Sequence, residues 1–128
     1  MTEAAARPTE YAICASSAIA EADGVLATAA GMEIGIFRLN GRLVAYENRC
    51  RHQGGPVCSG RVLGRLEAVL GPGGTVVDER FSESDLHLVC PWHGWEYDLA
   101  TGECSVDRTL RLRSFPVAER DGNVYVTV

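Results

Sequence analysis

The sequence predicts an all-β domain. We expect a sandwich or barrel of antiparallel strands with one long inserted segment. Short apolar runs alternate with turn dipeptides, most clearly at Asn40-Gly41 and Asp121-Gly122, which suit the positive φ angles of tight hairpin turns. No segment carries a sustained helical period, and the stretch 15–24 is the best, though short, helix candidate. With 46% hydrophobic and 23% charged residues, the composition is that of a globular domain.

The N-terminal elements follow from these patterns. Apolar runs at 10–19 and 24–30 are separated by the polar turn EADG. The segment 32–50 contains two β-like runs on either side of Asn40-Gly41 and is the clearest predicted hairpin. We expect residues 1–9 to be an N-terminal tail and residues 10–128 to form one domain.

Two further hairpins are predicted in the C-terminal half. The segment 86–104 would turn around the ATGE sequence, and the segment 109–128 around Asp121-Gly122. In the last strand Val124, Val126 and Val128 alternate with other residues and should face a core. The segment 61–85 is the hardest to assign, because its apolar runs are interrupted by GPGG and by an acidic stretch.

Charge and targeting signals narrow the functional classes. The net charge of −5 argues against nucleic acid or an anionic membrane as a partner. The N-terminal residues do not form a signal peptide, and no apolar run approaches the roughly 20 residues of a membrane span. We therefore expect a cytoplasmic protein. In that reducing compartment the five cysteines are better interpreted as ligands or buried thiols than as disulfides.

Two short motifs contain the metal-ligating residue types. Cys50 and His52 lie in CRHQGGP, and Cys90 and His93 lie in CPWHGW. Two thiolates and two imidazoles suit either zinc or an iron–sulfur cluster. Each motif supplies one residue of each type, an arrangement that favours a binuclear cluster with the cysteines on one iron and the histidines on the other.

Residues around the four ligands favour the same chemistry. Glycines permit close approach of backbone N–H groups to sulfur, prolines stiffen the loops and tryptophans exclude water. The expected surrounding residues are Gly54, Gly55, Pro56, Pro91, Trp92, Gly94, Trp95 and Tyr97.

The paired motifs resemble the Rieske [2Fe–2S] family, and CPWHGWEYDLATGE is similar to its oxygenase-associated ferredoxin branch. The resemblance covers about residues 10–128. It implies an antiparallel β-domain with an inserted cluster-binding subdomain at about 48–104. It also implies that Cys50 and Cys90 bind one iron, and His52 and His93 the other.

The sequence departs from the wider family in three places. Trp92 stands where respiratory members have a disulfide-forming cysteine. Trp95 replaces their serine, which donates a hydrogen bond to a sulfide, and leaves Tyr97 as a nearby donor. We therefore expect a low potential, roughly −150 mV. The spacer between the motifs is unusually long, and residues 66–80 are interpreted as an inserted hairpin, either a surface elaboration or part of a docking surface.

The number of histidines distinguishes an electron carrier from an oxygenase. The chain has three histidines, so once two bind the cluster only His87 remains, and the two-histidine, one-carboxylate iron site of an oxygenase cannot be built. The resemblance implies a monomeric electron carrier, not an enzyme, between a flavin-dependent reductase and a terminal oxygenase. The alternatives are a small subunit of a larger oxidoreductase, such as nitrite reductase, and a metal-stabilised interaction module. His87 is interpreted as solvent-facing or hydrogen-bonded, and Cys14, Cys58 and Cys104 as spare thiols.

Overall fold

The computed structural model describes residues 8–51, 54–92 and 94–128, without the side chains at 61, 65–68 and 79–84. These residues form ten β-strands and three short 3₁₀-helices, and none of them is in an α-helix. The prediction of an all-β fold is confirmed. Among the same residues no helix has the length and apolar character needed to cross a membrane. The chain divides into two compact units, residues 1–47 with 114–128, and residues 48–113.

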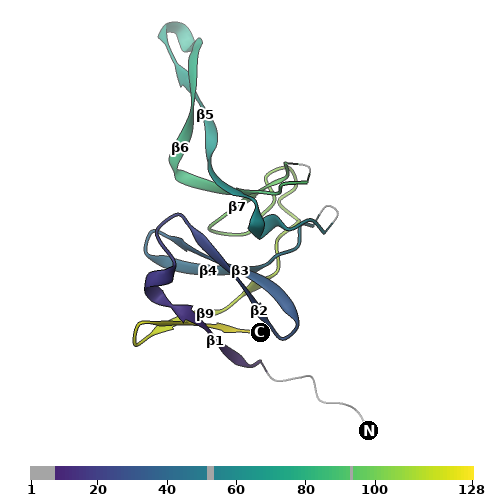
Figure 1. Ribbon diagram of the computed structural model, residues 1–128. Coiled ribbons are helices and arrows are strands. Elements are labelled where there is room, and N and C mark those ends of the chain that lie inside the picture. Colours follow the sequence, from purple (N-terminus) through teal and green to yellow (C-terminus); the bar gives the residue numbers. More distant parts are fainter. Residues whose placement is uncertain (1–7, 52–53, 93) are drawn as a thin grey trace. The chain divides into compact units, whose positions relative to one another are not determined.

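The first unit contains two antiparallel sheets with strand orders β1-β10-β9 and β2-β3-β4-β8 (Figure 1). The helix candidate at 15–24 is wrong, because only a single 3₁₀ turn, η1 (Ser16–Ala18), forms there. The strands are β1 (Glu10–Ala15), β2 (Gly24–Ala29), β3 (Met32–Leu39), β4 (Arg42–Glu47), β8 (Ser114–Phe115), β9 (Val117–Arg120) and β10 (Asn123–Thr127).

Three two-residue turns connect the hairpins of this unit. Asn40-Gly41 joins β3 to β4, and Asp121-Gly122 joins β9 to β10, with positive φ at all four residues. Both predicted hairpins are confirmed. Ala30-Gly31 joins β2 to β3 with the same backbone signs. That turn was not singled out in the sequence, because alanine disfavours positive φ.

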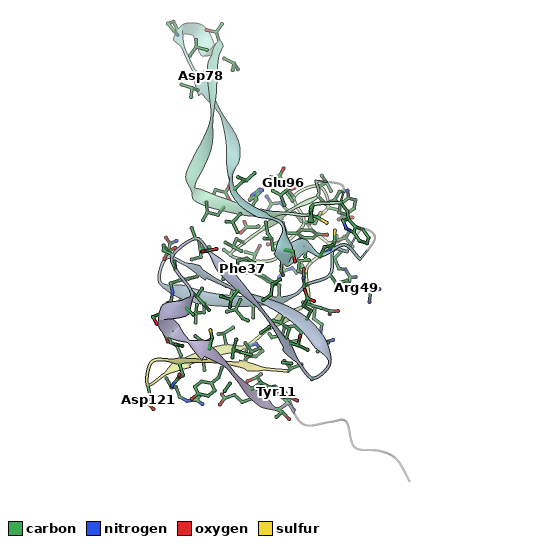
Figure 2. All side chains as sticks on the ribbon, viewed as in Figure 1. Tyr11, Phe37, Arg49, Asp78, Glu96 and Asp121 are labelled. Carbon is green, nitrogen blue, oxygen red and sulfur yellow. The ribbon has the colours of Figure 1, made fainter. Side chains whose placement is uncertain are left out.

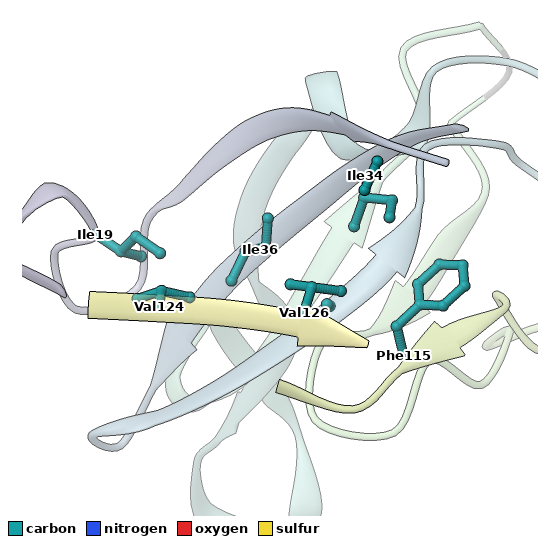
Figure 3. Packing of buried hydrophobic residues seen from close by; sticks show 8 residues of the cluster. Ile19, Ile34, Ile36, Phe115, Val124 and Val126 are labelled. Atoms are coloured by element: carbon teal, nitrogen blue, oxygen red, sulfur yellow. The ribbon is translucent and has the colours of Figure 1, made fainter. Parts of the chain in front are cut away.

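The core of the first unit lies between its two sheets (Figure 3). Val124 and Val126 are fully buried, as their alternation predicted, and Val128 is partly buried against the same cluster. The other members of the buried cluster are Ile19, Ala29, Ile34, Ile36, Ala45 and Phe115.

The second unit is built on one three-stranded antiparallel sheet in the order β5-β6-β7. Its elements are β5 (Arg61–Leu70), β6 (Val76–Val89), β7 (Glu96–Asp98), and the 3₁₀ turns η2 (Val57–Ser59) and η3 (Pro72–Gly74). The expected hairpin around 66–80 is present, and it extends well beyond β7 (Figure 1). The hairpin predicted around ATGE is only partly correct. The main pairing is between β6 and β7, and the ATGE turn adds a single bridge between Tyr97 and Cys104.

Replacing Ile36 tests the core of the first unit. Ile36 is fully buried, so Ile36→Ala should lower the free energy of unfolding in urea by about 2–5 kcal/mol. The matched control is Leu26→Ala on the neighbouring strand, where the residue is 48% exposed and the expected change is within about 0.5 kcal/mol. Equal losses in the two variants would contradict this assignment of the core.

Candidate metal centre

The two cysteine motifs form loops with the same hydrogen-bond pattern. In the first loop the Cys50 N–H donates to the carbonyl of Gly55, at 2.7 Å, and the Gly54 N–H donates to the carbonyl of Cys50, at 2.9 Å. In the second loop Cys90 and Trp95 are joined in the same way at 2.8 Å, and Gly94 donates to Cys90 at 2.9 Å. Gly54 and Gly94 have φ of 76° and 72°, a region that favours glycine. Two segments far apart in sequence therefore present a cysteine in equivalent backbone settings.

Gly55 allows the two loops to approach closely. A Cβ atom at this position would lie 3.0 Å from Cys90 Sγ and 2.8 Å from a ring carbon of Trp92. A side chain here would press on the Cys90 sulfur and displace the Trp92 ring from its present position. Both cysteines are buried, with Cys50 3% and Cys90 2% exposed. The thiols are thus held in a site with little access for water.

Tyr97 places a polar group beside the first thiol. It lies in β7 and is fully buried. Its hydroxyl oxygen is 3.1 Å from Cys50 Sγ and accepts a hydrogen bond from the Arg51 N–H at 2.9 Å. Because the phenol has one proton and Arg51 already supplies a donor, that proton is available to the Cys50 sulfur.

Burial keeps Tyr97 in its neutral form. Desolvation raises the pKa of the phenol, and the hydrogen bond to Cys50 raises it further, so that it stays protonated at physiological pH. A neutral phenol donates to a thiolate more favourably as the sulfur gains negative charge. Tyr97 is therefore suited to stabilise an electron-rich sulfur.

The other expected site residues differ in their surroundings. Trp92 is 57% exposed although it packs against Gly55, whereas Trp95 is partly buried. Pro56 is partly buried, and Pro91 and Gly94 are exposed. The expected ligands His52 and His93 lie outside the described residues.

Asn48 is a positioning residue that sequence reasoning missed. Its side-chain oxygen accepts the Cys58 N–H at 2.7 Å, and its amide nitrogen donates to Ser59 Oγ at 3.2 Å. These bonds fix the segment that follows the first loop. The Asn48 signal is weak in sequence, because the residue pairs with backbone ten positions away. None of the described cysteines is in a disulfide, and Cys58 and Cys104 are buried.

The Rieske [2Fe–2S] domain model matches residues 9–116. The chain belongs to this family. Family membership brings a [2Fe–2S] cluster with cysteine and histidine ligands, and the sequence-based recognition is confirmed. This geometry fits such a group, since two buried thiols sit in matched loops with a neutral donor beside one of them.

The chain is similar in sequence to two curated relatives. It is 30% identical over 112 residues to Oxidoreductase NdmD of Pseudomonas putida, covering 80% of this chain and 16% of that protein. It is 27% identical over 97 residues to the 3-phenylpropionate/cinnamic acid dioxygenase ferredoxin subunit of Photorhabdus laumondii, covering 75% of this chain and 73% of the subunit. The chain thus matches a small part of one relative and most of the other.

Solved structures share the fold. A putative NADH-dependent nitrite reductase small subunit from Mycobacterium tuberculosis aligns with a TM-score of 0.70 at 17% identity, covering 96% of this chain and 97% of that one. The ferredoxin of carbazole 1,9a-dioxygenase from Nocardioides aromaticivorans IC177 aligns with a TM-score of 0.64 at 16% identity, covering 92% and 96%. At these identities the likeness concerns the fold.

Removing the Tyr97 hydroxyl should lower the reduction potential. The hydrogen bond to Cys50 stabilises the more negative, reduced state, so Tyr97→Phe should shift the potential down by about 40 mV, equivalent to about 1 kcal/mol. Protein-film voltammetry measures the shift. Tyr125→Phe in β10 is the control and should leave the potential unchanged. An unchanged potential in Tyr97→Phe would exclude this hydrogen bond as a tuning interaction.

Proposed function

We propose that this chain is a one-electron carrier, with Cys50 and Cys90 on one iron of its cluster and His52 and His93 on the other. It would take electrons from a flavin-dependent reductase and deliver them to a terminal oxygenase. The single observation that carries the proposal is the pair of matched loops, which presents two buried cysteines from motifs that each also contain a histidine.

The ferredoxin subunit from Photorhabdus laumondii supports a carrier rather than a catalyst. This chain matches 73% of that subunit, whose name assigns it to a dioxygenase system. The nitrite reductase small subunit supports the shared fold, and an obligate subunit is therefore the second candidate. We also propose a cytoplasmic, monomeric protein.

When bound, the cluster would accept and release a single electron. The protein's own residues set the conditions for that exchange. The buried thiols and the Tyr97 donor adjust the charge balance at sulfur, and the close approach at Gly55 fixes the loops so that little rearrangement accompanies the change of charge. Trp92, which is 57% exposed, provides an apolar surface beside Gly55 for contact with a partner.

Cysteine substitutions test the ligand assignment. Cys50→Ser and Cys90→Ser should each lose nearly all of the roughly two irons per chain, because a serine hydroxyl replaces a thiolate ligand. The matched control is Cys58→Ser, which changes a buried thiol that is not a proposed ligand, just after the first loop, and should retain iron. Iron and acid-labile sulfide are measured on protein that elutes as folded material. Iron loss in Cys58→Ser with retention in Cys90→Ser would overturn the assignment.

Electron transfer tests the function itself. The dithionite-reduced protein, freed of excess reductant, is mixed anaerobically with an oxidised Rieske-type terminal oxygenase, and the two absorption spectra are followed by stopped flow. A carrier should be reoxidised with a rate that rises with oxygenase concentration. A protein that transfers no electrons to any tested oxygenase and aggregates on size exclusion would instead fit the obligate subunit.

A further inference from the structure

His87 is buried in the second unit on the sheet face that Tyr97 does not occupy. It lies in β6, where it is 6% exposed and pairs with Asp98 of β7. Strand alternation puts Asp85 on the same face as His87, and Glu96 on the same face as Asp98. Tyr97, between Glu96 and Asp98, points to the other face, toward Cys50. Three carboxylates therefore surround one buried imidazole (Figure 2 labels Glu96).

The two ring nitrogens of His87 each face a carboxylate. Nδ1 lies 3.2 Å from Glu96 Oε1, and Nε2 lies 3.4 Å from Asp85 Oδ1. If the Nδ1–H donates to Glu96, a neutral ring directs the lone pair of Nε2 toward an anionic oxygen. A cation bound by both atoms would offset the repulsion between them, as a second ring proton would, so the pair is a candidate for metal binding rather than proof of it.

The spacing of these atoms suits a metal ion. One ligand atom from each of Asp85, His87 and Asp98 lies within 4.8 Å of the other two. Metal–ligand distances of about 2.0–2.2 Å place neighbouring ligands roughly 3.0–3.6 Å apart in octahedral or tetrahedral geometry, a range that includes the 3.4 Å between Nε2 and Asp85 Oδ1. The Asp98 carboxylate, one oxygen of which accepts the Ala100 N–H, would supply the third ligand atom from within 4.8 Å of the other two.

A cavity adjoins the three ligands. It has a volume of about 170 Å³ and is lined by Asp85, His87 and Asp98 together with Glu103, Cys104, Ser105 and Arg108. That volume is large enough for an ion together with waters in its remaining coordination positions. Glu96 lies outside the three, on the opposite ring nitrogen, which is the position of the carboxylate that orients a metal-bound histidine in many proteins.

We propose that Asp85, His87 and Asp98 form a second metal site, for a divalent first-row transition cation, and that Glu96 positions the His87 ring. The site is separate from the cluster loops and shares no ligand with the proposed cluster. Its one imidazole and two carboxylates also differ from the two-histidine, one-carboxylate iron site of oxygenases. Bound metal would join β6 to β7 on the face opposite Tyr97.

Mn²⁺ is the appropriate probe. Carboxylate-rich sites suit it, whereas Zn²⁺ would also bind the free thiols of the chain. The cluster-loaded protein is dialysed to equilibrium against increasing Mn²⁺, and manganese and iron are counted together. We expect one saturable Mn²⁺ per chain with the iron content unchanged, and a rise in melting temperature on binding.

Variants that each remove one negative charge test where the Mn²⁺ binds. Asp85→Asn and Asp98→Asn should each weaken Mn²⁺ binding at least 100-fold, and Glu96→Gln roughly 10-fold. Asp121→Asn is the control, because it removes one negative charge at an exposed turn whose positive φ asparagine accepts. This control should bind Mn²⁺ as the parent protein does.

Two results would overturn the proposal. One is the absence of saturable Mn²⁺ binding up to millimolar concentration, which would mean that a proton on His87, or Arg108, supplies the positive charge among the carboxylates. The other is Mn²⁺ binding that Asp85→Asn and Asp98→Asn leave unchanged, which would place the ion elsewhere. His87→Gln alone is not used, because removal of a buried ring can unfold the unit, and the asparagine variants keep the readout independent of that loss.

Discussion

The close approach of the two cysteine loops is the constraint on which the second unit depends. A Cβ atom at Gly55 would lie 3.0 Å from Cys90 Sγ and 2.8 Å from the Trp92 ring, so glycine lets the loops approach without displacing either side chain. The shared hydrogen-bond pattern then gives Cys50 and Cys90 equivalent settings. The remaining interactions depend on this contact between the loops. They are the burial of the two thiols, the hydrogen bond from Tyr97 to Cys50 and the hydrogen bond between Asn48 and the Cys58 N–H.

The three residues of strand β7 point alternately to the two faces of the sheet, and each face has a different chemical environment. Tyr97 is directed to the thiol side, while Glu96 and Asp98 belong to the face that carries His87. One strand of three residues therefore contributes side chains both to the buried cysteine site and to the charged cluster around His87. Because both faces share one backbone, a shift of register would exchange them, and the pairing of Leu88 with Tyr97 fixes which face is which.

The parts of the fold that depend on local backbone preference were predictable. Asn40-Gly41 specifies its turn because few residues other than Asn and Gly accept positive φ, and the cysteine–histidine motifs are equally local. The Ala30-Gly31 turn was not predicted, because alanine disfavours the positive φ that it adopts there between β2 and β3. The ATGE hairpin was predicted only in part, and the surroundings of His87 were not predicted, because both depend on the β6–β7 register, which no short segment encodes.

The second unit leaves the first at Glu47 and rejoins it at Ser114, and the strands at these two points are direct neighbours. Ala45 pairs with Phe115, and Tyr46 with Ser114. Residues 48–113 are thus a single large loop between the ends of an antiparallel strand pair. Closure entropy grows slowly with length, so lengthening the segment between these strand ends adds only about 0.6 kcal/mol per doubling to the cost of closing it. Because the β5–β6 hairpin lies inside this closed segment, its length can differ without any change in the strand pairs that close the junction.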